Sequence, residues 1–264
     1  MSEKLNGREL ASFIQERQAA QVRSLRGSKV FPKLAIFYDN DSPVIAKYME
    51  LKQNYGADIQ IDVDVVKITT DNAVEELQKA ANDDNTQGII VQLPLKFVDM
   101  SILDEIPLEK DVDGLREQSD TATAMAIHWL LTSYGVDLPH LKLAVVGRGK
   151  LVGRPLIRMW TESGYDVKEF GRDGDLNELK DFDVVVTATG VPHLIKGEML
   201  KPGAVVVDAG TASEGGVLVG DLDEAARERS DLILTPKTGG VGPLTVTMLF
   251  ERLLQACEKK RKKN

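Results

Sequence analysis

Short apolar runs, most of them rich in β-branched residues, alternate with longer stretches of helical pattern along this chain, and the alternation leaves few folds open. Strands that alternate with helices form crossover units, which build mainly parallel sheets with helices on their faces. A length of 264 residues allows one large domain or two ordinary ones, and we expect two lobes. The sequence therefore predicts an α/β fold with strands at Leu34–Tyr38, Ile59–Ile68, Gly88–Gln92, Leu143–Val146, Val184–Thr187, Val205–Val207 and Leu232–Leu234.

The charge and the cysteine count exclude several classes of protein. A formal net charge of -8 argues against nucleic-acid binding, because phosphate binding needs a concentrated basic face. The basic run Lys259–Lys263 is interpreted as the solvated, fraying end of a helix. Cys257 is the single cysteine, which excludes a disulfide framework and fits a reducing cytoplasm. Without a secretion signal or a membrane-spanning apolar run, we expect a cytoplasmic protein.

A glycine-rich loop follows the predicted strand Leu143–Val146, where G-R-G-K-L-V-G-R-P leads into a helical stretch. In a strand, loop and helix of this kind, Gly147 allows a tight turn and Gly149 lets backbone N–H groups approach a pyrophosphate. Gly153 permits close packing of the helix. The spacing is one residue longer than the common dinucleotide pattern, so a purely structural glycine turn stays an alternative.

The next predicted strand, Asp166–Phe170, ends where a dinucleotide's adenosine ribose would lie. An arginine at that place favours the 2′-phosphate of NADP, and an acidic residue favours the free 2′-hydroxyl of NAD. Arg148 and Arg172 are cations that favour NADP. Glu169 favours NAD if it faces the ribose, and Arg172 is equally consistent with a solvated loop charge. The sequence predicts NADP, with NAD as the alternative.

Three further segments follow predicted strands and are candidates for a ligand cleft. Thr187–Pro192, T-A-T-G-V-P, and Val205–Thr211 come at strand ends, where ligands bind in open parallel sheets. Both are also consistent with ordinary connections. Pro236–Thr247, P-K-T-G-G-V-G-P-L-T-V-T, packs three glycines and Pro243 before a helix. It is either a close backbone approach to a ligand or a left-handed glycine turn.

Four polar residues in the first half of the chain are candidates for catalysis. Tyr48 and Lys52 are four residues apart and so lie on one helical face. Gln92 ends an apolar strand in G-I-I-V-Q-L-P-L. Asp113, in D-V-D-G, precedes a glycine as many turn residues do. Taken alone, Lys52 and Tyr48 are consistent with a surface lysine beside a half-buried tyrosine.

Five motifs in this order resemble the methylenetetrahydrofolate dehydrogenase/cyclohydrolase family over nearly the whole chain. They are Y-x-x-x-K, V-Q-L-P-L, K-D-V-D-G, V-V-G-R-x-x-x-V-G-R-P and T-P-x-x-G-G-V-G-P-x-T-V. The resemblance implies an N-terminal αβα catalytic lobe, a Rossmann-type dinucleotide-binding lobe and a C-terminal helix that returns to the first lobe. It places the catalytic, folate-binding domain at residues 1–118 with 243–264, and the NAD(P)-binding domain, with its linker helix, at 119–242.

The resemblance implies oxidation of 5,10-methylenetetrahydrofolate by hydride transfer to NADP, followed by hydrolysis of 5,10-methenyltetrahydrofolate to the 10-formyl form. Lys52 would be the catalytic lysine, its pKa lowered by burial and by a cationic substrate. Gln92 would orient that lysine, Tyr48 would line the pterin, and Asp113 would accept hydrogen bonds from the pterin. A folate wall would include Gly239, Gly240, Val241 and Pro243.

The same resemblance implies a homodimer without a catalytic metal, and the three histidines, His128, His140 and His193, form no plausible ligand cluster in the sequence. The residues expected to bind the cofactor are Gly147, Arg148, Gly149, Val152, Gly153, Arg172, Thr189, Gly190, Pro192 and Thr211.

This chain also departs from the family pattern, which keeps alternatives open. Asp39-Asn40 and Val44-Ile45 replace a usual Val-Gly pair and a later Ala-Ser pair, so the motif aligns in two frames. The forward frame places Tyr48 and Lys52 on the family tyrosine and lysine; the backward frame places Val44 and Tyr48 there. T-A-T-A at Thr121–Ala124 and Lys237-Thr238 are further departures. We favour the forward frame. Two alternative functions stay open: a dehydrogenase that lacks cyclohydrolase activity, and a non-catalytic regulator that binds a dinucleotide or folate.

Overall fold

A computed structural model describes residues 4–116, 119–215 and 217–261; Lys262 and Lys263, from the predicted basic run, lie outside the described residues. The chain divides into two compact units. The N-terminal unit comprises Ser12–Ala122 and Val246–Asn264, and the central unit comprises Met1–Ala11 and Thr123–Thr245. Each unit is built around its own parallel sheet, which confirms the predicted α/β fold of two lobes.

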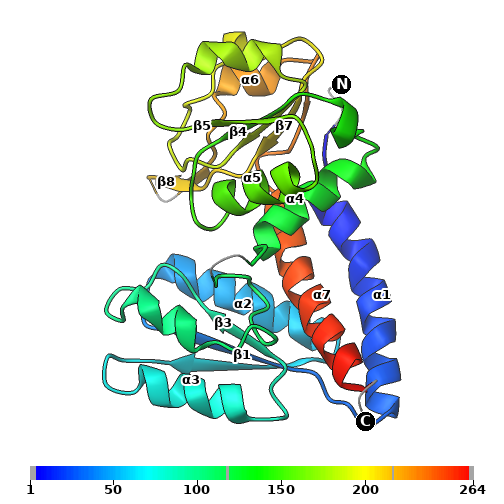
Figure 1. Cartoon of the computed structure of the whole chain (residues 1–264), viewed down its shortest axis with the longest axis vertical. Helices are drawn as coiled ribbons and strands as arrows, with labels where there is room; N and C mark the ends of the chain where they lie inside the picture. The colour runs from blue at the N-terminus through cyan, green and yellow to red at the C-terminus, as the bar shows by residue number, and fades with distance from the viewer. Residues whose placement is uncertain (1–3, 117–118, 216, 262–264) are drawn as a thin grey trace. The chain divides into compact units, whose positions relative to one another are not determined.

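The sheet of the N-terminal unit has three parallel strands in the order β2-β1-β3. These are β1 (Lys33–Tyr38), β2 (Asp62–Lys67) and β3 (Gly88–Val91), joined through α2 (Pro43–Asp58) and α3 (Ala73–Asn82). The two helices lie on opposite faces of the sheet (Figure 1). A short helical segment, η1 (Met100–Glu105), follows β3. The crossover connections make all the strands parallel, so their carboxyl ends meet at one edge.

One predicted strand is too long. The run Ile59–Ile68 was expected to be extended throughout, but β2 begins only at Asp62. The first residues of the run end α2 instead: the N–H of Ile59 bonds the carbonyl of Tyr55, and Gln60 has a φ of 63° in a tight turn. β-branched residues favour strands, but here the hydrogen bonds at the helix end determine the backbone.

Two long helices carry residues of both units: α1 (Gly7–Gly27) and α7 (Val241–Arg261). In the N-terminal unit they lie side by side (Figure 1), and Gln18 Nε2 donates to Thr247 O at 3.1 Å and to Glu251 Oε2 at 2.9 Å. The rings of Tyr55 and Phe250 stack with their centroids 4.9 Å apart. These contacts confirm that the C-terminal helix returns to the first lobe.

The central unit contains a five-stranded parallel sheet in the order β10-β7-β6-β4-β5. Its strands are β4 (Leu143–Val146), β5 (Val167–Phe170), β6 (Val184–Thr187), β7 (Val205–Asp208) and β10 (Ile233–Leu234); the hairpin β8 (Ala212–Glu214) and β9 (Val217–Val219) stands apart. Its helices are α4 (Ala122–Ser133), α5 (Gly153–Glu162) and α6 (Glu224–Glu228), with short helical turns η2 (Leu138–His140), η3 (Leu176–Asp181) and η4 (Gly197–Met199).

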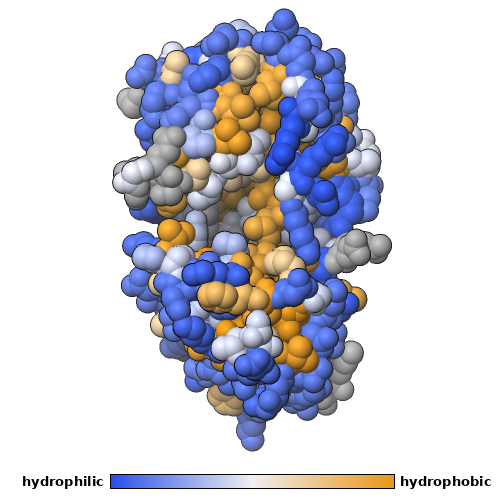
Figure 2. Space-filling view, turned by 90° about the vertical axis from the view of Figure 1, so that its left-hand side faces the viewer, coloured by the Kyte–Doolittle hydropathy of each residue, from blue (hydrophilic) through white to orange (hydrophobic). Residues whose placement is uncertain are grey.

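The β4 and β6 strands are buried along their whole length, as expected for the apolar runs L-A-V-V and V-V-V; the buried polar residue at the end of β6 is Thr187. Hydrophilic residues cover much of the face shown in Figure 2, and hydrophobic residues gather on it in patches. Among the residues that the structure describes, no helix is both long and apolar enough to span a bilayer.

Candidate active site and cofactor loop

Helix α2 carries Lys52 on its buried face. The helix begins after Ser42, whose hydroxyl accepts a hydrogen bond from Ile45 N at 3.3 Å, and Pro43 occupies its first turn. Ile45, Met49, Lys52 and Gly56 are the buried residues of α2 and recur at helical spacing. Only 7% of the surface of Lys52 is exposed, which is unusual for a lysine.

Gln92 lies directly beyond the carboxyl end of β3 and is the partner of Lys52. Its Oε1 accepts a hydrogen bond from Lys52 Nζ at 2.5 Å, and its Nε2 donates to Leu93 O at 2.9 Å. The second bond fixes which end of the amide faces the lysine. The structure therefore brings these two predicted catalytic residues together.

Asp113 is the third charged or polar group of this cluster. Burial lowers the pKa of Lys52, and the negative charge of Asp113 opposes that shift. Burial likewise raises the pKa of Asp113, against the effect of the Lys52 charge. The loop that carries Asp113 is held by Asp111, whose carboxylate accepts hydrogen bonds from the backbone N–H groups of Gly114 and Arg116 at 2.9 and 3.0 Å. The cluster thus holds a lysine whose charged form is destabilised by burial.

Tyr48 lies one turn before Lys52 on α2 and is 36% exposed. Val44, another turn earlier, is 47% exposed. Neither side chain is buried with Gln92 as Lys52 is. In the backward frame Tyr48 would stand at the lysine position, yet the residue that contacts Gln92 is Lys52.

The loop after β4 makes a tight turn and close backbone contacts at positions where the chain has glycine. Gly147 has a φ of 105°, in the region that favours glycine. A Cβ on Gly147 would come within 2.6 Å of Ala188 O, and one on Gly153 within 1.9 Å of Gly147 O. Gly153 therefore allows the first turn of α5 to pack against the loop itself. Val152 precedes that helix, and no heavy atom lies within 4 Å of a Cβ placed on Gly149.

Arg148 and Glu169 form an ion pair at the end of β5. Arg148 Nη2 lies 2.6 Å from Glu169 Oε1, and both side chains are about half exposed. A Cβ on Gly171 would lie 3.3 Å from Arg148 Cζ, so the guanidinium extends along the segment that leads to Arg172. Arg172 is exposed in the turn that follows. Two of the residues weighed for cofactor choice, Arg148 and Glu169, are therefore in contact.

The segment after β6 contacts the glycine loop through Ala188. Within it, Thr189 Oγ1 accepts a hydrogen bond from Val191 N at 3.1 Å, and Gly190 has a φ of 68°. A Cβ on Gly190 would lie 3.6 Å from Thr211 O, so the ends of β6 and β7 are adjacent. Pro192 is partly buried and Thr211 is exposed. The structure thus brings Thr189 close to Gly147, and Gly190 close to Thr211, at the carboxyl edge of the sheet.

The second glycine-rich segment joins β10 to α7. Gly239 has a φ of 85°, and its carbonyl accepts a hydrogen bond from Arg8 N at 2.9 Å. A Cβ on Gly7 would lie 1.9 Å from Gly240 O, so the start of α1 packs directly on this loop. The helix begins at Val241, inside the glycine-rich segment, and Pro243 is tolerated because first-turn N–H groups have no partner in the helix.

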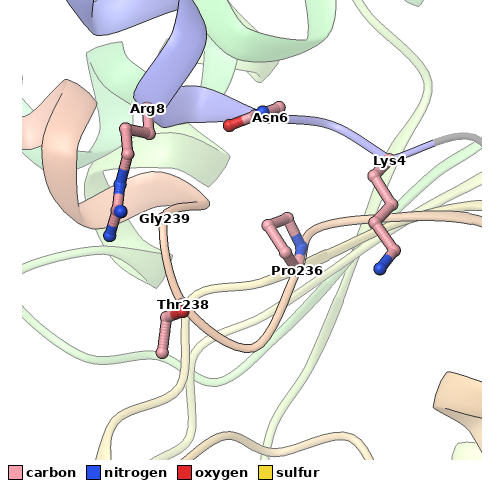
Figure 3. Close-up of a pocket in the computed structure, with 6 residues that line it drawn as sticks. All are labelled: Lys4, Asn6, Arg8, Pro236, Thr238 and Gly239. Atoms are coloured by element: carbon pink, nitrogen blue, oxygen red, sulfur yellow. The ribbon is translucent and has the colours of Figure 1, made fainter.

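A pocket of about 220 Å³ opens at this loop (Figure 3). Lys4, Asn6 and Arg8 line it from the start of the chain, and Pro236, Thr238 and Gly239 line it from the loop. One lining residue, Thr238, belongs to the Lys237-Thr238 pair that departs from the family pattern. Gly240 and Val241 are buried, and Pro243 is partly buried.

Two of the histidines have partners close to them in the sequence or in the fold. Trp160 Nε1 bonds His128 Nδ1 at 3.2 Å, burial lowers the pKa of His128, and His140 lies 2.9 Å from Asp137. Within residues 4–116, 119–215 and 217–261, no group of three or more His, Cys, Asp or Glu side chains could hold a metal ion.

Two family models match this chain in consecutive segments. Residues 5–113 match the tetrahydrofolate dehydrogenase/cyclohydrolase catalytic domain, and residues 121–261 match the NAD(P)-binding domain of the same family. The chain belongs to the tetrahydrofolate dehydrogenase/cyclohydrolase family. The first match includes Lys52, Gln92 and Asp113, and the second includes both glycine-rich loops.

Relatives within the tetrahydrofolate dehydrogenase/cyclohydrolase family cover the chain almost completely. The bifunctional protein FolD of Halothermothrix orenii is 33% identical, over 97% of this chain and 98% of its own length. The crystal structure of the bifunctional FolD enzyme from Campylobacter jejuni matches with a TM-score of 0.92 and 28% identity, over 98% of this chain and 100% of that chain. The Trypanosoma brucei enzyme, solved with NADP and an inhibitor, has a TM-score of 0.89 and 29% identity, over 98% of each chain.

The sequence did not indicate the contacts of two buried carboxylates, Asp39 and Asp221. Asp39 was noted only as a departure from the family pattern, yet its carboxylate accepts hydrogen bonds from Lys96 N, Phe97 N and Val98 N at 2.8, 2.6 and 2.7 Å. Asp221 bonds the backbone of the Thr189 segment. The partners of Asp39 are backbone N–H groups, which leave no pairwise signal in a sequence, and Asp221 bonds one backbone N–H and the hydroxyl of Thr187, 34 residues away. A weak signal is that Asp39, like Gln92, is a polar residue directly after an apolar strand.

Proposed function

We propose that this chain oxidises 5,10-methylenetetrahydrofolate with NADP as hydride acceptor and hydrolyses the resulting 5,10-methenyltetrahydrofolate to 10-formyltetrahydrofolate. Membership of the family gives the chain its two activities, dehydrogenase and cyclohydrolase. The observation that carries the residue assignment is the buried pair of Lys52 and Gln92. A buried lysine with a lowered pKa is available as a neutral base closer to physiological pH than an exposed one.

In the hydrolytic step Lys52 acts as general base. Its Nζ accepts a proton from the water whose oxygen bonds to the methenyl carbon, and the electrons of the C=N⁺ π bond pass to N5, so the positive charge of the substrate is lost. The C–N5 bond of this adduct then breaks as N5 gains a proton and the hydroxyl loses one, which gives the 10-formyl product and releases one proton overall. Gln92 Oε1 holds the lysine in place through the bond from Nζ. Asp113 supplies a carboxylate to accept hydrogen bonds from the pterin, and Tyr48 lines the pterin from the exposed side of α2. Gly239, Gly240, Val241 and Pro243 are proposed to form the folate wall.

The glycine loop fits a dinucleotide. Gly149 has no neighbouring atom where a side chain would stand, and the loop runs from a parallel strand into the first turn of α5. NADP, when bound, accepts the hydride; Gly147, Gly149, Val152 and Gly153 would hold its pyrophosphate. Arg148 and Arg172 would hold the 2′-phosphate, and Thr189, Gly190, Pro192 and Thr211 would line its nicotinamide half.

The forward frame is supported by where the side chains lie. Lys52, not Tyr48, contacts Gln92 and is buried. This geometry favours retained cyclohydrolase activity over a dehydrogenase alone. The curated relatives from Halothermothrix orenii and Staphylococcus aureus are both named bifunctional.

One assay separates the proposed functions. Purified protein is incubated with methylenetetrahydrofolate and either NADP or NAD, while reduced cofactor and methenyl absorbance are followed together. We expect NADP reduction with little lasting methenyl product. Persistent methenyl product would favour the monofunctional dehydrogenase, and no reduction with either cofactor would favour the non-catalytic regulator.

Hydrolysis of supplied methenyl substrate tests the lysine assignment without any cofactor. Lys52→Ala should lower that rate by about 100-fold, because a general base commonly contributes this much. Lys47→Ala is the matched control, since Lys47 lies on the exposed side of the same helix. An unchanged rate in Lys52→Ala would refute the assignment.

We further propose that the protein is a cytoplasmic homodimer, as the family resemblance implies. Sedimentation analysis of the purified chain should give about twice the mass of 29.0 kDa. A monomer across the working range of concentration would contradict the dimer.

A further inference from the structure

We propose that Asp221 is a positioning residue for NADP: its carboxylate fixes the backbone of the segment Thr187–Pro192, hereafter the Thr189 loop. The inference rests on the proposed function, because it assumes that this loop receives the dinucleotide. Asp221 itself is fully buried and therefore acts through the loop rather than by touching the cofactor.

The carboxylate of Asp221 binds the loop at two points. Its Oδ2 accepts a hydrogen bond from Thr187 Oγ1 at 2.6 Å and another from Thr189 N at 2.7 Å. Thr187 is the last residue of β6, so the two bonds join the strand end to the loop that continues from it. Bonds to an ionised acceptor are stronger than those between neutral groups. The loop therefore leaves the sheet in a direction set by Asp221.

Asp221 is held in turn by Asp208 at the end of β7. Asp208 Oδ1 accepts hydrogen bonds from Asp221 N at 3.0 Å and from Gly210 N at 3.1 Å. Its Oδ2 pairs with Arg227, which offsets the second buried negative charge. One network thus joins the carboxyl ends of β6 and β7, the edge of the sheet where ligands bind.

The packing around the two carboxylates leaves no room for side chains. A Cβ on Gly210 would lie 2.0 Å from Asp221 Oδ1, and one on Gly220 would lie 2.0 Å from Asp208 Oδ2. Asp221 Oδ1 is also a buried oxygen with no hydrogen-bond partner among the described residues. Leaving a buried acceptor unpaired costs stability. The fold nevertheless keeps this carboxylate in place, and its Oδ2 accepts the two hydrogen bonds that hold the Thr189 loop.

The Thr189 loop also contacts the dinucleotide-binding turn. A Cβ on Gly147 would come within 2.6 Å of Ala188 O and within 3.3 Å of Thr189 Cγ2. A shift of the loop would therefore move the wall against which the glycine turn packs. Loss of the Asp221 carboxylate should weaken cofactor binding without disturbing Lys52 and Gln92, which belong to the N-terminal unit.

The test uses two measurements. Titration calorimetry gives the Kd of NADP, and a separate assay without cofactor gives the rate of methenyltetrahydrofolate hydrolysis. Asp221→Ala should raise the Kd at least about tenfold, the effect of losing one charged hydrogen bond, while hydrolysis stays within about twofold. Asp221→Asn, which keeps an acceptor oxygen, should restore most of the affinity. Asp181→Ala, an exposed carboxylate in the same unit, is the control.

Gly210→Ala gives an independent route, because its methyl group would displace Asp221 without removing the carboxylate; it too should raise the Kd. An unchanged Kd in Asp221→Ala, or an equal loss of binding and hydrolysis, would overturn the inference. The wild type separates this inference from the proposed function. If the wild type binds NADP but does not oxidise methylenetetrahydrofolate, the proposed reaction is refuted, and the comparison of Kd values still tests the role of Asp221.

Discussion

At the residue scale, the contact between Arg148 and Glu169 bears on the choice between NADP and NAD. The carboxylate holds the guanidinium at 2.6 Å and places a negative charge beside the expected 2′-phosphate. A phosphate would have to compete with Glu169 for the same cation. If Arg148 binds the 2′-phosphate as proposed, we expect Glu169 to lower the affinity for NADP through its contact with Arg148.

Glu169→Gln should strengthen NADP binding several-fold, because it frees Arg148 and removes repulsion of the 2′-phosphate. The Kd of NAD should change little. Titration calorimetry with both cofactors measures the two effects. Glu178→Gln is the control, since Glu178 forms a similarly exposed pair with Lys168 in the same unit. Equal changes for NADP and NAD would contradict a contact at the 2′ position.

Lys52 should set the pH dependence of hydrolysis. Its neutral form is the base and burial lowers its pKa, so the rate should rise with pH and level off below the ordinary lysine value of about 10.4. Gln92→Glu would place a carboxylate beside Nζ, favour the ammonium and move the rise to higher pH. The pH profile of methenyl hydrolysis measures this. Gln53→Glu, exposed on the same helix, should leave the profile in place.

At the element scale, Asp39 ties the connection after β1 to the segment after β3. Its carboxylate accepts three backbone hydrogen bonds from residues 96–98, and Asn40 Nδ2 donates to Pro94 O at 3.2 Å. That segment begins just beyond Gln92. The residues that depart from the family's Val-Gly pair thus connect the two loops on either side of the lysine cluster.

Asp39→Ala should cost about 2–3 kcal/mol of unfolding free energy at pH 7, because three N–H groups lose a charged acceptor. Burial acts to raise the pKa of Asp39, but the backbone hydrogen bonds together outweigh it and hold the pKa below its unfolded value. Its contribution is therefore present above the unfolded pKa and is lost as pH falls through the folded one. Denaturant unfolding at several pH values should show the wild-type advantage shrinking below about pH 4. Asp41→Ala, in the same loop but exposed, is the control; a pH-independent difference would contradict the role.

The sequence predicted strands such as β4 and β6 because they are short, mostly apolar and buried, so their pattern and their structure agree. It failed at Ile59–Ile61, where a β-branched run ends a helix. Helix α1 was not predicted, although Ile14, Val22 and Leu25 are buried on it at helical spacing. Lys52 and Gln92 could be paired through their motifs. The contacts of Asp39 could not, because any sequence offers the same backbone N–H groups. Those of Asp221 could not either, because one is to a backbone N–H and the other, to the Thr187 hydroxyl, spans 34 residues.

At the scale of the whole molecule, the division of the chain depends on long-range pairing. The predicted domain boundaries, at 118/119 and 242/243, stay a prediction. The two compact units of the structure meet at 122/123 and 245/246, and residues 1–11 belong to the central unit. Lys4 pairs with Leu234, and Leu5 N bonds Leu234 O at 3.1 Å. No local pattern in the first residues indicates that partner, so the sequence could not assign them.

Binding of NADP to the central unit should stabilise the folded chain by mass action. At about 100 times its Kd, a ligand that binds only the folded state adds about 2.7 kcal/mol. For a protein of this size that corresponds to a rise of about 5–10 °C in the unfolding midpoint. Calorimetric scans at increasing NADP concentration measure the shift. Lys52→Ala should keep it, because Lys52 belongs to the N-terminal unit, whereas Asp221→Ala should need about tenfold more NADP for the same rise. A midpoint that does not depend on NADP would contradict binding by the glycine loop of Gly147 and Gly153.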